Sequence, residues 1–141
     1  LKILLKRLSD IDLETRSNAA YATGQLIFNS TDSNTYLPHF NTILRKLEPM
    51  LQLEGARIKD NAAGCISRMI MAQPTVLPLG EILPVLVSLL PLKEDYEENT
   101  PVYACIFKLR KFPRSSMPVM TTGLIAFDSR GAGTYHSAAG S

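Results

Sequence analysis

Four acidic residues lie between two apolar runs in the segment LPLKEDYEEN, which spans residues 90–99. Carboxylates this close together can form a surface for a basic partner. They can also stabilise the start of a following helix through its macrodipole, by about 0.3 to 1 kcal/mol each. The residues alone leave both interpretations open. The candidate contacts for a basic protein partner are Glu94, Asp95, Glu97, Glu98 and Asp60, with Asp10, Asp12 and Glu14 from equivalent turns.

Nucleophilic or metal-assisted chemistry would need a different set of residues. Cys65 and Cys105 lie 40 positions apart with no CxxC pattern, and His39 and His136 occur in unrelated contexts. The sequence contains no GxGxxG, P-loop, HExxH or GxSxG motif. We therefore predict no enzyme activity, no cofactor and no metal site, and we interpret both cysteines as buried, reduced thiols. A cysteine nucleophile with a histidine base is the alternative, and unusual thiol reactivity at pH 7 would support it.

Composition is typical of one ordinary domain. The chain has 141 residues, of which 45% are apolar, and its 15 basic and 13 acidic residues give a net charge of only +2. Such a balance provides no strongly basic field for nucleic acid or a membrane surface. The longest apolar stretch, residues 74–92, contains Glu81 and several prolines, so it is a poor membrane span, and no signal peptide is visible. Because the amphipathic run LKILLKRL starts at Leu1 without a cap, we expect a piece of a longer protein.

Hydrophobic periodicity predicts three helix pairs, at about residues 1–28, 36–72 and 79–111. In the first pair, Asp10 or Asp12 can cap the helix that begins near Leu13. In the second pair, apolar residues from Leu37 to Leu51 recur at spacings of three and four, and Glu54 and Gly55 then break the pattern.

Pro101 limits the last helix of the third pair. Proline is tolerated in the first turn of a helix and kinks one further in. We therefore expect this helix to start near Asn99 or Thr100, which leaves the acids at 94–98 partly ahead of it.

An internal repeat relates the second helices of the pairs. RSNAAYATGQLI, from Arg16, aligns with KDNAAGCISRMI, from Lys59, at an offset of 43 residues, and aligning Cys65 with Cys105 gives an offset of 40. A two-helix unit that recurs at about 40 to 47 residues is the signature of HEAT or armadillo arrays. The sequence thus predicts an all-α HEAT-repeat solenoid of about two and a half to three helix pairs.

Small residues in the aligned helices are predicted to serve packing, since they allow helix axes to approach closely. The two asparagines of the shared Asn-Ala-Ala motif could hydrogen-bond the loop of a neighbouring repeat, or they could be exposed to solvent. The predicted packing residues are Asn18, Ala19, Ala20, Gly24, Asn61, Ala62, Ala63 and Gly64.

Residues 112–141 have a different character. From Pro113 onward Gly, Ser, Thr and Pro are in excess and no helical period is present, so we predict an irregular, disordered tail. A HEAT array should continue here with another helix. The tail could therefore reflect a splice variant, an altered reading frame or an error in the gene model.

Three segments together resemble the C-terminal half of the importin-β, or karyopherin-β, superfamily, and most closely its importin-4 type. They are DLETRSNAAYATGQLI, DNAAGCISRMI and LPLKEDYEENTPVYACIFKL. The last is the most specific, because LPLKED followed by Glu and a Val-Tyr-x-Cys pattern is not a general HEAT feature. The resemblance covers about residues 1–111 and stops at the tail.

The resemblance implies a nuclear import receptor that shuttles between cytoplasm and nucleus with basic cargo such as histones and ribosomal proteins. It implies release of that cargo by Ran-GTP, through N-terminal repeats outside this chain, and possible contact with nucleoporins. Basic cargo in this family usually meets the concave side, formed by the second helices of the repeats. No direct nucleic acid partner and no membrane partner are expected. The alternative is a HEAT-repeat scaffold protein unrelated to transport.

Overall fold

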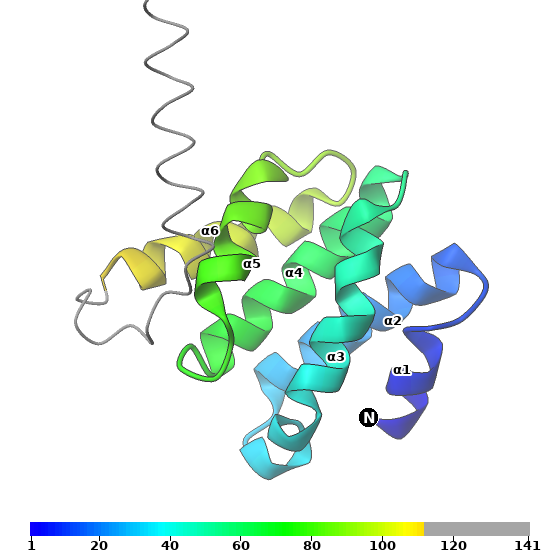
Figure 1. Cartoon of the computed structure of the whole chain (residues 1–141), viewed down its shortest axis with the longest axis horizontal. Coiled ribbons are helices and arrows are strands. Elements are labelled where there is room, and N and C mark those ends of the chain that lie inside the picture. Colours follow the sequence, from blue (N-terminus) through cyan, green and yellow to red (C-terminus); the bar gives the residue numbers. More distant parts are fainter. Residues whose placement is uncertain (112–141) are drawn as a thin grey trace, which may run out of the picture.

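The computed structural model describes residues 1–111, and the regular secondary structure in this part of the chain is entirely helical, without strands (Figure 1). The all-α architecture predicted from the sequence is therefore confirmed. The predicted tail, residues 112–141, lies outside the described residues. The α-helices are α1 (Lys2–Arg7), α2 (Leu13–Asn29), α3 (Phe40–Leu47), α4 (Ala56–Ala72), α5 (Leu79–Ser88) and α6 (Asn99–Arg110).

The first helix of the second pair is shorter than the periodicity suggests. Only Phe40–Leu47 is α-helical, and the flanking segments Leu37–His39 and Glu48–Gln52 are 3-10 turns. Each of these turns carries a proline in its first two positions, Pro38 and Pro49. Proline has no N–H to donate, so the α-helical hydrogen-bond ladder cannot run through Pro49. The apolar face is continuous although the helix is not.

The second helices of the pairs form one layer. Helix α4 packs against α2 on one side and against α6 on the other, while α1 packs on α2 and α3 on α4. In Figure 1, α1, α3 and α5 lie in front of the layer formed by α2, α4 and α6. Because α4 contacts the second helix of both neighbouring pairs, its side chains decide how the three pairs fit together.

One apolar core joins the two layers. Phe40, Ile43 and Leu47 of α3 are fully buried together with Ile66 and Met69 of α4. The ring of Tyr36 stacks on that of Phe40 with centroids 5.4 Å apart. The same cluster continues into α5 and α6 through Ile82, Leu86, Val102 and Cys105.

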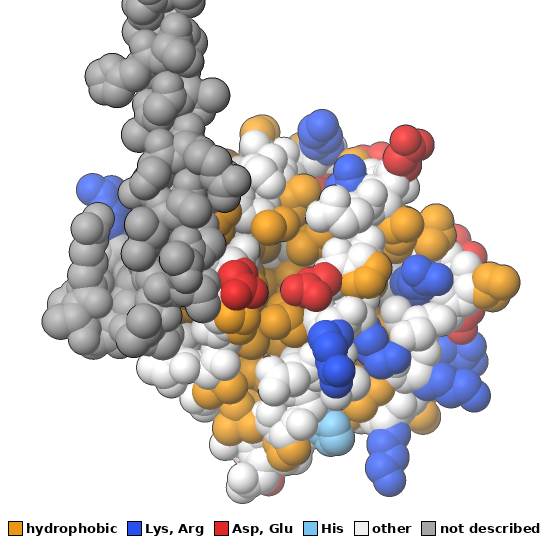
Figure 2. All heavy atoms as spheres, in the orientation of Figure 1, with side chains coloured by type: hydrophobic (Ala, Val, Ile, Leu, Met, Phe, Trp, Pro, Cys, Tyr) orange, Lys and Arg blue, Asp and Glu red, His pale blue; other side chains and the backbone are white. Residues whose placement is uncertain are grey.

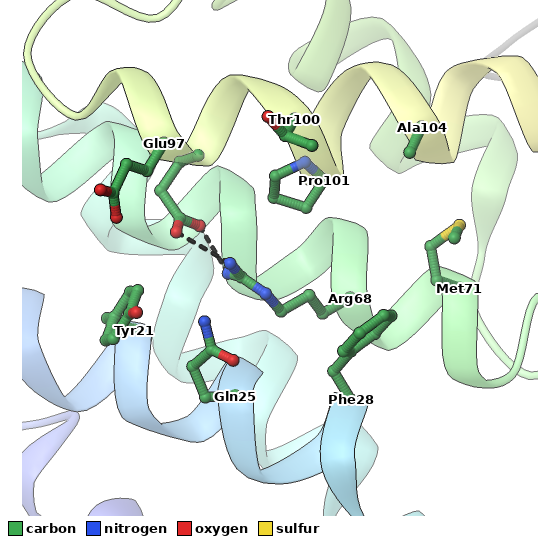
Figure 3. A pocket seen from close by; sticks show the side chains of 10 residues that line it. Tyr21, Gln25, Phe28, Arg68, Met71, Glu97, Thr100, Pro101 and Ala104 are labelled. Atoms are coloured by element: carbon green, nitrogen blue, oxygen red, sulfur yellow. Dashed lines mark hydrogen bonds and ion pairs between the residues drawn. The ribbon is translucent and has the colours of Figure 1, made fainter.

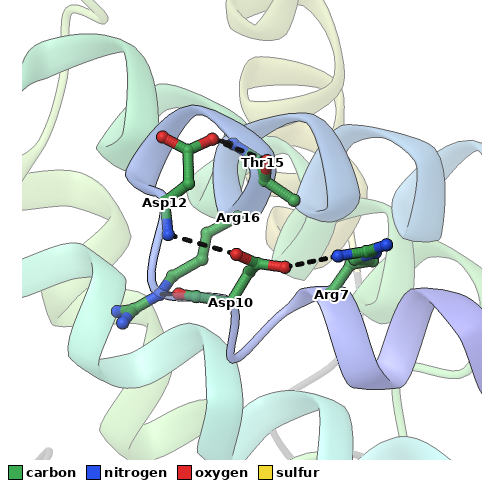
Figure 4. A network of polar contacts seen from close by, with 5 residues as sticks. All are labelled: Arg7, Asp10, Asp12, Thr15 and Arg16. Carbon is green, nitrogen blue, oxygen red and sulfur yellow. Dashed lines mark hydrogen bonds and ion pairs between the residues drawn. The ribbon is translucent and has the colours of Figure 1, made fainter.

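Local signals define where the second helices begin. Asp12 precedes α2 and accepts hydrogen bonds from the Thr15 amide (2.8 Å) and the Thr15 hydroxyl (2.6 Å), so it is the N-cap (Figure 4). Asp10 instead pairs with Arg7 at 2.7 Å. Helix α4 follows Gly55, whose φ of +122° is a backbone conformation that favours glycine. Helix α6 begins at Asn99, so Pro101 falls in its first turn as predicted.

The cap of α2 predicts an acid-dependent stability. Hydrogen bonds from Thr15 lower the pKa of Asp12 below its ordinary value of 3.8. A carboxylate whose folded-state pKa is lowered stabilises the fold above its unfolded pKa, and that stabilisation is lost as pH falls below about 3.8. We expect Asp12→Asn, which keeps an acceptor for Thr15, to show a smaller drop in melting temperature between pH 5 and pH 3 than the wild type, measured by circular dichroism.

Glu14→Gln is the matched control, because it removes one carboxylate from the same turn without touching the cap. It should retain the acid dependence of the wild type. An identical acid dependence in Asp12→Asn and the wild type would contradict the assignment of the cap.

Candidate functional site

The four acids between α5 and α6 do not share one environment. Glu94 and Glu97 are exposed, Asp95 is half-buried and Glu98 is fully buried. They are neighbours in the sequence, but only Glu94, Asp95 and Glu97 reach the surface. Basic side chains, by contrast, gather over α1 and α3 on the face shown in Figure 2.

Glu98 forms a buried, bidentate ion pair with Arg68 of α4. Nη1 of Arg68 lies 2.5 Å from Oε2 of Glu98, and Nη2 lies 2.9 Å from Oε1 (Figure 3). The guanidinium group also lies over the ring of Tyr21 in α2, 5.7 Å from its centroid. The prediction that Glu98 contacts cargo is therefore wrong, because its carboxylate is 0% exposed and already neutralised.

Two glycines make room for this ion pair. A Cβ atom at Gly64 would lie 1.4 Å from Oε2 of Glu98. A Cβ atom at Gly24 would lie 3.0 Å from the Cα atom of Cys65 and 3.2 Å from Cδ of Arg68. Gly24 thus allows α2 and α4 to approach closely, as expected of a packing residue. Gly64 instead makes room for the carboxylate of Glu98, which occupies the space that a side chain at position 64 would fill.

Asp60 anchors the beginning of the same loop. Its Oδ2 atom accepts hydrogen bonds from the backbone amides of Lys93 (3.1 Å), Glu94 (2.8 Å) and Asp95 (2.9 Å). Successive amides that converge on one anion form a backbone nest. Asp60 is 3% exposed, so the predicted cargo contact at this position is also incorrect. Its negative charge is used inside the protein to position the loop.

Asn61 connects α4 in the other direction. Its Nδ2 atom donates to the hydroxyl of Ser17 in α2 at 2.8 Å, and both residues are buried. The predicted bond to a neighbouring repeat is present, but its acceptor lies on a helix and not on a loop. The equivalent Asn18 is exposed beside Leu4 and Arg7. The remaining predicted packing residues, Ala19, Ala20, Ala62 and Ala63, are buried in α2 and α4.

The cysteines provide no nucleophile. Burial raises the pKa of the Cys65 thiol to about 12 and that of Cys105 to about 11, so both are protonated at pH 7. Within residues 1–111, no cluster of His, Cys, Asp and Glu side chains has the arrangement of a metal site. His39 is half-buried in a 3-10 turn, and His136 lies outside the described residues. Helices in this range are also too short or too polar to cross a membrane.

A groove runs beside the ion pair and was not predicted from the sequence. It has a volume of about 340 Å³ and lies between α2, α4 and α6. Tyr21, Gln25 and Phe28 line it from α2 at helical spacings of four and three (Figure 3). The 43-residue offset relates Gln25 to Arg68 and Phe28 to Met71, which also line it. This shared face of the second helices was the signal in the sequence that could have revealed the groove.

The stacked helix pairs define the class of protein as a HEAT-repeat α-solenoid. No model of a known protein family matches the chain. The chain is 44% identical to the "Probable importin subunit beta-4" of Schizosaccharomyces pombe over 76% of its length. It is 36% identical over 84% of its length to the human protein "Importin-4", and 36% identical over 68% to the mouse protein of the same name.

These matches place the chain in a particular family. It belongs to the importin-β, or karyopherin-β, superfamily and is of the importin-4 type. The chain spans about a tenth of the length of these relatives.

The ion pair predicts a large, non-additive effect on stability. Removal of one partner leaves the other charge buried and unpaired, which costs about 3 to 5 kcal/mol. We therefore expect Arg68→Met to lower the free energy of unfolding by about that amount, as measured by urea denaturation. Arg68→Met combined with Glu98→Gln should cost clearly less than the sum of the two single changes.

Glu97→Gln is the control, because it changes an exposed acid next to Glu98 and should shift stability by no more than about 0.5 kcal/mol. Additive effects of Arg68→Met and Glu98→Gln would show that the two side chains do not act as a pair.

Proposed function

We propose that the chain is a segment of a nuclear import receptor and contributes to binding basic protein cargo during transport between cytoplasm and nucleus. The observation that carries this proposal is the similarity to proteins named importin over 68–84% of the chain. Histones and ribosomal proteins are the proposed cargo. The role is one of binding, without catalysis and without a cofactor.

The proposed cargo contacts are the acids of the loop between α5 and α6 that reach the surface. Glu94 and Glu97 are exposed and Asp95 is half-buried, all within one short loop. That loop is held at its start by Asp60 and at its end by the pair of Glu98 with Arg68. A loop fixed in this way loses little conformational entropy when a partner binds, so weak surface charges can act together. These three acids are the proposed site for lysine and arginine side chains.

Other proposed partners would act elsewhere in the full protein. Ran-GTP is proposed to bind N-terminal repeats outside this chain and to release cargo, and nucleoporins are further partners. In this proposal the segment forms part of the surface that binds cargo and contributes to the curvature of the solenoid. It does not itself contain the Ran-GTP-dependent switch that releases cargo.

A pull-down of the intact protein with a lysine-rich histone tail peptide tests the transport role. We expect the peptide to bind and to be released when Ran-GTP is added. Binding that is insensitive to Ran-GTP would favour a HEAT scaffold unrelated to transport, and no binding at all would refute the cargo role.

The acidic loop itself is tested by charge removal in the intact protein. Glu94→Gln with Glu97→Gln should weaken binding of the same peptide about three- to tenfold and reduce its dependence on salt, because two exposed charges that each contribute a fraction of a kcal/mol are lost. Fluorescence anisotropy at two ionic strengths measures both effects. Glu48→Gln with Glu81→Gln is the matched control, since it removes the same charge from exposed acids outside the loop. Equal weakening by both double variants would contradict a specific contact.

A further inference from the structure

The groove between α2, α4 and α6 has apolar walls. Phe28 is 55% exposed and Tyr21 is 38% exposed, and both contribute to its α2 side. Met71 lies on the α4 side, and Pro101 and Ala104 face it from α6 (Figure 3). Its volume of about 340 Å³ is near the lower end of sites that bind small ligands, about 300 to 1,000 Å³. The space suits one or two side chains and is too small for a helix.

Among the residues that line the groove, the exposed charge without an ion-pair partner is negative. Arg68 is the one basic residue among the lining side chains, and it is neutralised by Glu98 within the protein. Glu97 also lines the groove and is exposed, and it lies at the end of the groove near Tyr21 (Figure 3). A basic residue that flanks an apolar group in the groove therefore has one exposed carboxylate to pair with at the end near Tyr21.

We infer that this groove receives a large apolar side chain of a cargo segment whose neighbouring residues are lysine or arginine. The apolar side chain packs between Phe28 and Pro101, and the basic neighbour pairs with Glu97. This inference rests on the proposed cargo role and specifies which basic segments the protein binds most tightly. A basic segment with an apolar residue in its centre binds more tightly than an equally basic segment without one, because only the former removes the exposed groove surface from water.

Three peptides of equal length separate the apolar contribution to binding from the electrostatic contribution. The first is lysine-rich with one central leucine, the second has serine in place of that leucine, and the third keeps the leucine but has glutamine in place of the lysines. With the intact protein, we expect the leucine-to-serine change to weaken binding about tenfold. We expect the third peptide to be weaker than the first, with little dependence on salt.

Two matched variants locate the effect of the leucine. Phe28→Gln should bring the leucine and serine peptides to within about twofold of each other while binding of the serine peptide stays unchanged. Phe107→Gln is the control, because Phe107 is 61% exposed on α6 but does not line the groove, and it should preserve the tenfold difference. Thermal melts of both variants should match the wild type, since both side chains are largely exposed.

The outcomes distinguish the inference from the cargo role on which it rests. Equal affinity of the wild type for the leucine and serine peptides overturns the inference and leaves the cargo role intact. Failure of every peptide to bind overturns both. The inference is also refuted if Phe107→Gln acts like Phe28→Gln, or if light scattering shows a wild-type dimer that Phe28→Gln abolishes. In the latter case a second copy of the chain occupies the groove.

Discussion

The ion pair between Arg68 and Glu98 is the contact that fixes how the third helix pair sits on the second. A buried pair contributes little net stability, because desolvation of the two charges offsets much of their attraction. Its consequence is geometric, since a shifted packing that separates the two charges but keeps them buried leaves them uncompensated. The pair can form only because Gly64 lacks a side chain at the place that the carboxylate fills. Helix α6 therefore has one favourable position on α4.

Helix α4 connects the pairs on both sides through side chains of different chemistry. Asn61 bonds to Ser17 in α2, while Asp60 and Arg68 hold the two ends of the loop before α6. In a solenoid each repeat contacts only its neighbours, so such links determine local curvature. The same links leave Glu94 and Glu97 on the surface and place Glu97 at the apolar groove. Packing and proposed recognition thus depend on the same few buried polar groups.

The helix pairs could be predicted from the sequence, but which of the acids are exposed and which are buried could not. Periodic apolar residues and the repeated Asn-Ala-Ala motif predict the helices and the close packing of α2 on α4, because both depend on local spacing. Glu97 and Glu98 are adjacent and chemically identical, yet one is exposed and the other buried. Their difference depends on where Arg68 lies after α4 and α6 have packed, which is a long-range contact. An arginine four residues after a glycine, in the mostly apolar stretch of α4 at residues 62–70, was the local hint.

Buried polar groups of α4 hold the acidic loop in one place. Amide hydrogen exchange at Lys93, Glu94 and Asp95 tests it most directly, because all three amides donate to Asp60. Asp60→Ala should accelerate their exchange by about tenfold or more, whereas Asn61→Ala, which removes only the bond to Ser17, should leave it unchanged. Unchanged exchange of the three amides in Asp60→Ala would show that Asp60 does not hold the loop.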